Sequence, residues 1–231
     1  MALVKICGVE SARDVDLLRD CGVDLVGVWC GVAGGPRDLP VGRAAALVAR
    51  AAAAPGCRPV LVTTLADERR LRDVVARTGA RWVQLHGWQP PALVRRLKAE
   101  PGLTVVKVLH VREGSCPEQR LVPAYERAGT DLFLLDALAP DGRVGSTGSP
   151  VGVAAALAVA DRCTRPFLLA GGISAANRAA HDAVVAHPLY RGVDVDGAAR
   201  DDRGRLDARR VGELLRAWRP GPARPAAAPA R

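Results

Sequence analysis

Aromatic residues are scarce in this chain of 231 residues: they make up 3% of it, as four tryptophans, two tyrosines and two phenylalanines. Lysine is scarcer still, with Lys5, Lys98 and Lys107 alone, so the net charge of +9 comes almost entirely from arginines scattered among alanines and prolines. A nucleic-acid-binding surface gathers its cations on one face and interleaves aromatic rings for stacking. The composition therefore argues against a nucleic-acid partner.

Long apolar runs are also missing, and no segment approaches the ~20 residues that a membrane-spanning helix needs. The N-terminus shows no charged segment leading into an apolar core, so we expect a cytoplasmic protein with neither a secretion signal nor a membrane partner. The six cysteines include no Cys-x-x-Cys pair and no Cys/His cluster at metal-ligand spacing. We therefore predict no metal site, and we expect most of these cysteines to pack as small hydrophobes.

Short apolar segments alternate with longer amphipathic ones along the chain. Apolar strands without polar alternation, flanked by helices, are typical of a parallel sheet buried on both faces. Eight such units predict an α/β fold built as a single (βα)8 TIM barrel over residues 1–219, and a doubly wound open sheet is the alternative. Residues 220–231, which contain little besides proline, alanine and arginine, are expected to be a disordered tail. The expected strands span residues 3–7, 25–29, 59–63, 82–85, 104–109, 132–136, 167–170 and 192–195.

The segments between the strands carry helix start and stop signals. Ser11 and Ser174 stand where N-caps belong, and Gly22, Gly79 and Gly129 follow expected helix ends. The expected helices span residues 12–21, 41–53, 67–78, 91–100, 116–128, 151–163, 175–186 and 207–218.

Polar residues that close the apolar segments are the candidates for function, because catalytic groups of a barrel lie at the carboxyl ends of its strands. Together they offer a thiol, carboxyl groups, a guanidinium, imidazoles and a glycine-lined anion site, but no metal triad and no dinucleotide-binding motif. In chain order they are Cys7, Arg37 in the second loop, Gln84 and His86, Lys107 and His110, Asp136, Gly171 and Gly172, and Asp194 and Asp196.

Cys7 and Asp136 are the two strongest of these candidates. Cys7 follows Lys5 by two residues, so both side chains lie on one face of the strand, where an ammonium favours the thiolate; inert packing is the alternative. Asp136 closes the run Leu-Phe-Leu-Leu, where partial burial keeps a carboxyl available as an acid; capping of the next loop is the alternative. A solvated or structural role is the alternative for three further residues: Arg37, His86 and Asp194.

An ordered series of short motifs runs through the chain. The motifs are KICG at 5–8, GPR at 35–37, QLHG at 84–87, VVKVLHV at 105–111, FLLDA at 133–137, GSTG at 145–148, LAGGI at 169–173 and GVDV at 192–195. In this order they resemble the motifs of the phosphoribosylanthranilate isomerase family, and the resemblance spans about residues 3–218.

The resemblance implies an isomerase, an intramolecular oxidoreductase of the aldose–ketose type, that performs an Amadori rearrangement of an N-ribosyl anthranilate in tryptophan biosynthesis. It also implies a small-molecule substrate, no cofactor, and a monomer or a homodimer. By resemblance Asp136 is the general acid, Cys7 is the general base, and Arg37 pairs with the anthranilate carboxylate. Further substrate contacts are expected from His86, Asp194, Gly171, Gly172 and Asp196.

Three segments depart from the family pattern. Residues 145–150 read GSTGSP, without the family's lysine and aromatic–acidic ending, and residues 29–34 replace a more aromatic, serine-containing stretch. After the eighth strand Asp196, Gly197 and Ala198 stand where the family has a Ser-Ser-Gly turn that cradles the phosphate. A carboxylate roughly 4 Å from a phosphate costs about 4 kcal/mol at an effective dielectric near 20. Either Asp196 turns away from the phosphate, or the phosphate handle has changed.

These departures leave two alternatives open. One is a paralogue in specialised metabolism that keeps the Cys7 and Asp136 pair but acts on a different or unphosphorylated substrate. The other is a non-catalytic barrel that serves as a binding protein, against which the intact acid and base both argue.

Overall fold

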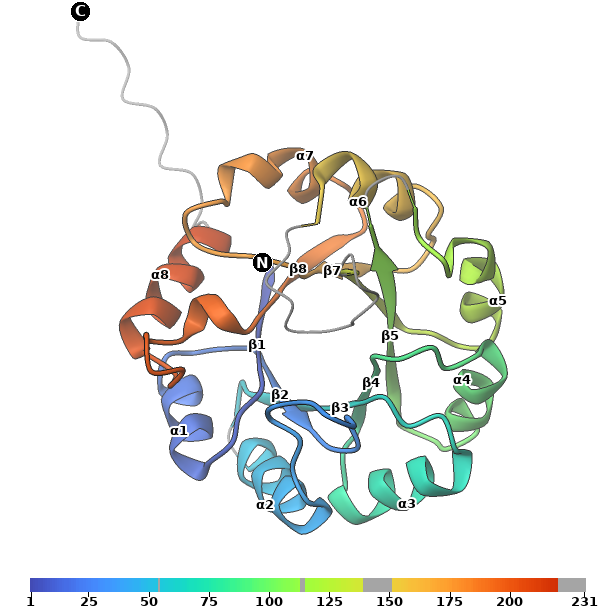
Figure 1. Ribbon diagram of the computed structural model, residues 1–231, viewed down its shortest axis with the longest axis horizontal. Coiled ribbons are helices and arrows are strands. Elements are labelled where there is room, and N and C mark those ends of the chain that lie inside the picture. Colours follow the sequence, from blue (N-terminus) through green and yellow to red (C-terminus); the bar gives the residue numbers. More distant parts are fainter. Residues whose placement is uncertain (54, 113–114, 139–150, 220–231) are drawn as a thin grey trace, which may run out of the picture.

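Eight parallel strands close into a barrel that is ringed by helices (Figure 1). The computed structural model describes residues 1–53, 55–112, 115–138 and 151–219. The predicted tail and the predicted GSTGSP loop therefore lie outside the described residues. The strands are β1 (Leu3–Cys7), β2 (Leu25–Trp29), β3 (Arg58–Thr63), β4 (Trp82–Leu85), β5 (Thr104–Val111), β6 (Leu132–Ala137), β7 (Phe167–Leu169) and β8 (Tyr190–Val195).

Closure of the barrel decides between the two predicted folds. Each strand pairs in parallel with the next one along the chain, and β1 also pairs with β8, with Lys5 opposite Asp194. An open doubly wound sheet has two free edges, whereas here none is left. The predicted single (βα)8 barrel is thus confirmed.

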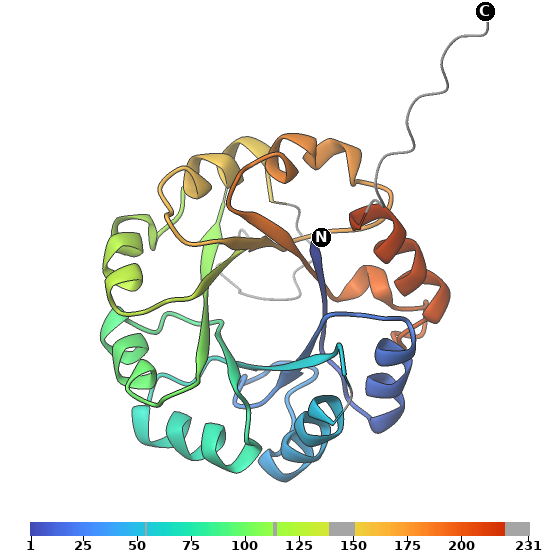
Figure 2. The same ribbon diagram turned by 180° about the vertical axis from the view of Figure 1, so that it is seen from behind.

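The helices form the outer layer, visible from both sides of the barrel (Figures 1 and 2). Where described, none of them is long and apolar enough to cross a membrane. They are α1 (Ala12–Asp20), α2 (Val41–Ala52), α3 (Glu68–Thr78), α4 (Pro91–Lys98), α5 (Val122–Arg127), α6 (Val153–Ala160), α7 (Asp182–Val185) and α8 (Ala208–Trp218), with 3₁₀ turns at Gln119–Leu121, Ala179–His181 and Gly197–Ala199.

Local sequence explains several helix ends. Ser11 accepts a hydrogen bond from the backbone N–H of Asp14, whose carboxylate in turn accepts from the backbone N–H of Ser11, so a complete capping box starts α1. Gly79 ends α3 with a φ of 67°, in the left-handed region that favours glycine. Both of these predicted signals are confirmed.

The predicted helix over residues 175–186 is wrong in its first half, and Ser174 caps no α-helix. Asn177 accepts a hydrogen bond from the Ser174 backbone N–H and donates one to the Gly172 carbonyl. Such short-range bonds offer the backbone an alternative to the helical ladder. The chain forms only a 3₁₀ turn and the four-residue α7 here.

Two apolar layers follow from the alternation of side chains along the strands. Val106 and Val108 of β5 belong to the cluster that fills the barrel, with Leu134 of β6, whereas Val105 and Leu109 pack in the layer between strands and helices. The same alternation turns polar residues near the strand ends toward the barrel mouth.

Candidate active site

A cavity of about 500 Å³ opens at the carboxyl ends of the strands. This volume lies in the range of small-molecule sites. Its wall contains every residue that the sequence singled out as catalytic or substrate-binding: Cys7, Arg37, His86, Asp136, Gly171, Gly172, Asp194 and Asp196. Residues far apart in the chain are thus brought together as expected, and Trp29, for which no role was predicted, joins them.

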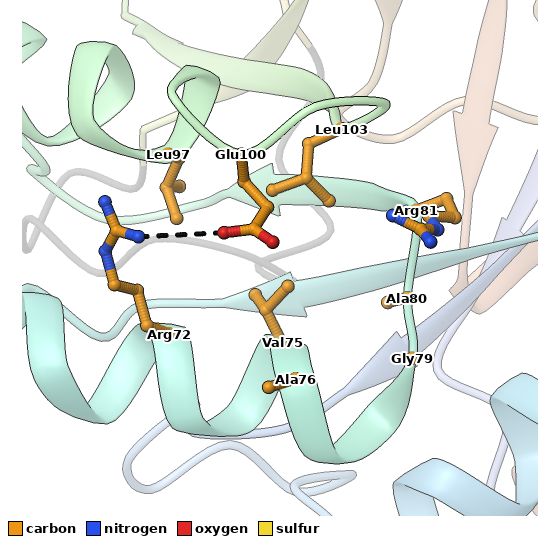
Figure 3. A pocket seen from close by; sticks show the side chains of 9 residues that line it. All are labelled: Arg72, Val75, Ala76, Gly79, Ala80, Arg81, Leu97, Glu100 and Leu103. Atoms are coloured by element: carbon orange, nitrogen blue, oxygen red, sulfur yellow. Dashed lines mark ion pairs between the residues drawn. The ribbon is translucent and has the colours of Figure 1, made fainter.

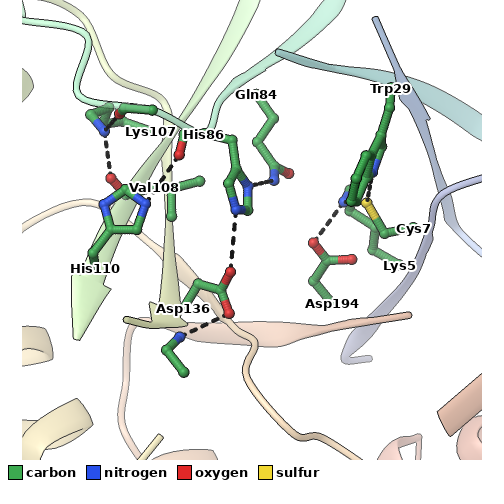
Figure 4. Close-up of polar contacts among 12 residues, drawn as sticks. Lys5, Cys7, Trp29, Gln84, His86, Lys107, Val108, His110, Asp136 and Asp194 are labelled. Atoms are coloured by element: carbon green, nitrogen blue, oxygen red, sulfur yellow. Dashed lines mark hydrogen bonds and ion pairs between the residues drawn. The ribbon is translucent and has the colours of Figure 1, made fainter. Parts of the chain in front are cut away.

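Lys5 connects the thiol to a carboxylate on the neighbouring strand (Figure 4). Its Nζ lies 2.7 Å from Asp194 Oδ2 and 3.3 Å from Cys7 Sγ, and the Lys5 side chain is fully buried. Burial acts to lower the pKa of Lys5, but Asp194 and Cys7 outweigh it and hold that pKa above its ordinary value. Lys5 and Cys7 therefore share a face, as the sequence predicted.

The thiol of Cys7 is harder to ionise than the sequence suggested. Burial raises its pKa to about 12, while the Lys5 ammonium acts to lower it. The expected influence of Lys5 on the pKa is present, but burial outweighs it, and the carboxylates of Asp194 and Asp196 also act to raise the pKa. Cys7 is thus mainly a thiol at neutral pH.

On the opposite wall, His86 lies between Gln84 and Asp136 (Figure 4). Gln84 donates its amide N–H to His86 Nδ1 at 2.9 Å, which puts the ring proton on Nε2. Nε2 faces Asp136 Oδ2 at 3.3 Å, and the other carboxylate oxygen of Asp136 accepts from the backbone N–H of Ala137. Among the described residues His86 Nε2 has no well-aligned hydrogen-bond acceptor, so it is available to a ligand.

The backbone that carries His86 is held by a buried cluster of Lys107, His110 and Glu118. The sequence singled out the first two as polar residues near a strand end, but it predicted neither Glu118 nor the pairing. His110 bonds the His86 carbonyl through Nε2 at 3.0 Å and the Glu118 carboxylate through Nδ1 at 2.5 Å. Lys107 donates to the Gly87 carbonyl at 2.8 Å. Lys107 was a candidate for the barrel mouth, but its ammonium lies over the ring of Tyr125 in α5, outside the cavity wall. Burial lowers the pKa of Lys107 to about 8.

Asp196 is paired with two arginines. Arg200 Nε donates to its carboxylate at 2.6 Å, and Arg37 Nε lies 3.5 Å from the same oxygen. Arg200 also donates to the carbonyls of Cys7 and Gly8, so it joins the end of β1 to the turn after β8. The sequence argument treated the Asp196 carboxylate as an uncompensated charge, whereas two arginines pair with it here. The expected repulsion is therefore largely offset.

Gly171 and Gly172 complete the cavity wall after β7, with φ angles of 82° and 63°. A Cβ atom on Gly171 would come within 3.0 Å of Ala137 and Val151. Glycine is required there, because both the backbone conformation and the space exclude a side chain.

A smaller cavity of about 310 Å³ lies between α3 and the segment that leads from α4 into β5 (Figure 3). Its wall carries the ion pair of Arg72 with Glu100 at 3.7 Å, beside apolar side chains. It contains no cysteine, histidine or aspartate, so it offers no nucleophile and no acid–base pair of the kind found at the barrel mouth. No group of metal-ligating side chains occurs among the described residues of the chain.

Comparisons of the sequence with known proteins identify one family. A family model of N-(5'phosphoribosyl)anthranilate (PRA) isomerase matches residues 4–217. The N-(5'-phosphoribosyl)anthranilate isomerase of Beijerinckia indica is 30% identical, over 94% of this chain and 94% of that protein. The enzyme of the same name from Rhodopseudomonas palustris is 32% identical, over 94% of this chain and 98% of that protein. The solved structure of N-(5'-phosphoribosyl)anthranilate isomerase from Pyrococcus furiosus has a TM-score of 0.73 at 26% identity and covers 94% of this chain and 98% of that chain.

Proposed function

The chain belongs to the N-(5'-phosphoribosyl)anthranilate isomerase family, and from this premise we propose how the barrel works. The protein is an isomerase that converts an aldose into a ketose by an Amadori rearrangement of phosphoribosylanthranilate in tryptophan biosynthesis. The observation that supports this function best is a thiol and a carboxyl group in the wall of one cavity at the barrel mouth, Cys7 on β1 and Asp136 on β6. We assign residues 1–219 as the catalytic domain.

Asp136 acts as the general acid in the first half of the reaction. It donates its proton to the ring oxygen of the furanose, the bond between that oxygen and C1 breaks, and the nitrogen lone pair forms a Schiff base. The N–H of His86 faces this carboxyl group at 3.3 Å. In that position it stabilises the carboxylate left behind when the proton departs.

Cys7 acts as the general base in the second half. Its thiolate removes the proton from C2, the electron pair moves toward the nitrogen, and the enolamine that results becomes the ketose. The Lys5 ammonium at 3.3 Å stabilises the thiolate before this transfer. The rearrangement moves protons only, so it needs no cofactor and no metal.

The remaining residues of the cavity wall bind the two ends of the substrate. Arg37 pairs with the anthranilate carboxylate through its planar guanidinium. Gly171 and Gly172 offer backbone amides to the phosphate, as glycine-rich loops after the seventh strand of such barrels do. Asp194 keeps one carboxylate oxygen without a hydrogen-bond donor among the described residues, and it accepts from a substrate hydroxyl.

The test is to supply the purified protein with freshly formed phosphoribosylanthranilate and follow the decay of its fluorescence. We expect the decay rate to rise in proportion to protein concentration, and the Cys7→Ser variant to serve as the blank. The unphosphorylated ribosyl anthranilate is the matched control and should react far more slowly. Faster turnover of that control would favour the paralogue, and no acceleration of either substrate would overturn the proposed function.

A further inference from the structure

Trp29 is the largest side chain among the described residues in the wall of the active-site cavity, and no role has been assigned to it so far. It ends β2, is only 6% exposed, and directs its indole N–H at the sulfur of Cys7 (Figure 4). The distance from Nε1 to Sγ is 3.0 Å, shorter than the 3.3 Å from the Lys5 ammonium to the same sulfur.

The neighbouring residue on the same face of β2 makes this contact geometrically feasible. Gly27 lies opposite Cys7 in the pairing of β1 with β2. A Cβ atom at Gly27 would come within 2.6 Å of Cys7 Sγ and 3.1 Å of Lys5 Nζ. Without a side chain at Gly27, the thiol and the ammonium occupy that space, and Trp29, two residues later, reaches over the sulfur.

We propose that Trp29 is a positioning residue for the general base: its indole N–H holds the sulfur of Cys7 and stabilises the thiolate that takes the proton from C2. The proposal rests on the proposed function for the identity of the base. It goes beyond that function in assigning the hydrogen-bond donor that helps this buried thiol to ionise.

The chemistry of the donor supports this role. An indole N–H donates and never accepts, so it binds a thiolate more strongly than a thiol and favours ionisation. Burial raises the pKa of Cys7, while Lys5 and Trp29 act to lower it and the carboxylates of Asp194 and Asp196 act to raise it further. Lys5 lies closer to Asp194 than to the sulfur, whereas the uncharged N–H of Trp29 is shared with no carboxylate of the described residues.

Two substitutions separate the N–H from the bulk of the ring. Trp29→Phe keeps an apolar ring but removes the donor. Trp29→His removes the benzene ring but keeps an N–H, because Nε2 of imidazole occupies the place in the five-membered ring that Nε1 has in indole. Trp88→Phe is the control for loss of a tryptophan, since Trp88 is 53% exposed and outside the cavity wall.

The first readout needs no substrate. Iodoacetamide reacts with the thiolate, and its reaction with Cys7 is followed by mass spectrometry of the tryptic peptide of residues 6–13, which contains no other cysteine. Between about pH 8 and pH 10 we expect Trp29→Phe to react about tenfold more slowly than Trp29→His, since a hydrogen bond to a charged group is lost. Trp88→Phe should react like the wild-type protein.

The second readout is kcat/KM with phosphoribosylanthranilate at neutral pH. We expect Trp29→Phe to lower it about tenfold, because a smaller fraction of Cys7 is ionised, and Trp29→His to recover most of that loss. Equal alkylation rates for the Phe and His variants would overturn the proposal, because the ring would then act by packing alone. If the wild-type protein does not isomerise the substrate, the proposed function fails, but the alkylation rates still decide the role of Trp29.

Discussion

Arg200 Nε lies 2.6 Å from the carboxylate of Asp196, and this ion pair compensates the negative charge of Asp196 at the barrel mouth. By the sequence resemblance Asp196 falls where the family has a phosphate-binding turn, and its side chain is 15% exposed. Considered alone it would repel a phosphate, but its charge is offset by Arg200 and, at 3.5 Å, by Arg37. The carboxylate is thus part of the framework that orients an arginine of the site.

The charge of Asp196 alone predicts that Asp196→Ser raises kcat/KM for a phosphorylated substrate. The ion pair with Arg200 predicts that the same replacement lowers kcat/KM. Loss of the carboxylate deprives the nearly buried Arg200 of its carboxylate partner and frees Arg37, so we expect a lower kcat/KM and a free energy of unfolding lower by about 1.5–3 kcal/mol. Steady-state kinetics and urea denaturation measure the two effects. A higher kcat/KM with unchanged stability would show that Asp196 acts only as a repulsive charge.

The acid and the base should each be indispensable. We expect Cys7→Ser or Asp136→Asn to lower kcat by about 100-fold or more, the usual loss when a positioned acid or base is removed. The volume of each side chain hardly changes, so the thermal unfolding midpoint should remain close to that of the wild-type protein. Near-wild-type turnover of either folded variant would remove the mechanism proposed above.

Arg37→Lys should weaken substrate binding although the positive charge is retained. Lysine lacks the planar pair of N–H donors that matches a carboxylate, so we expect KM to rise about tenfold while kcat changes less. Arg43→Lys, which alters an arginine outside the cavity wall, is the matched control. An unchanged KM in Arg37→Lys would show that Arg37 does not contact the substrate.

Alkylation of Cys7 by iodoacetamide should accelerate steadily with pH in the neutral and mildly alkaline range. Burial raises the pKa of Cys7 to about 12, so the thiol is protonated at neutral pH and its thiolate fraction grows as the pH increases toward that value. The measurement is the alkylation rate of the tryptic peptide of residues 6–13 as a function of pH, with Cys7→Ser as the blank. A rate that stops rising below about pH 8 would mean that the thiol is far more acidic than its burial implies.

Much of the fold was predictable from the sequence, because it depends on local patterns. Alternation of apolar and amphipathic segments indicated eight strand–helix units, and the period of two along β1 placed Lys5 and Cys7 on one face. The rule that parallel strands end at the same side brought Asp136 and the other candidates to one mouth. Competition between side-chain hydrogen bonds and the hydrogen bonds of a helix was harder to predict, as at Asn177, where two side-chain hydrogen bonds replaced a helical turn.

The sequence by itself determined that Cys7 and Asp136 lie at the barrel mouth, since strand alternation and chain order suffice for that. The tertiary structure alone decided how those side chains pair. Closure of β1 against β8 sets Lys5 opposite Asp194, and the turn after β8 gives Asp196 to Arg200. The physical reason is that the charge state of a buried group depends on its burial and on neighbours from other strands, and one-dimensional spacing contains neither.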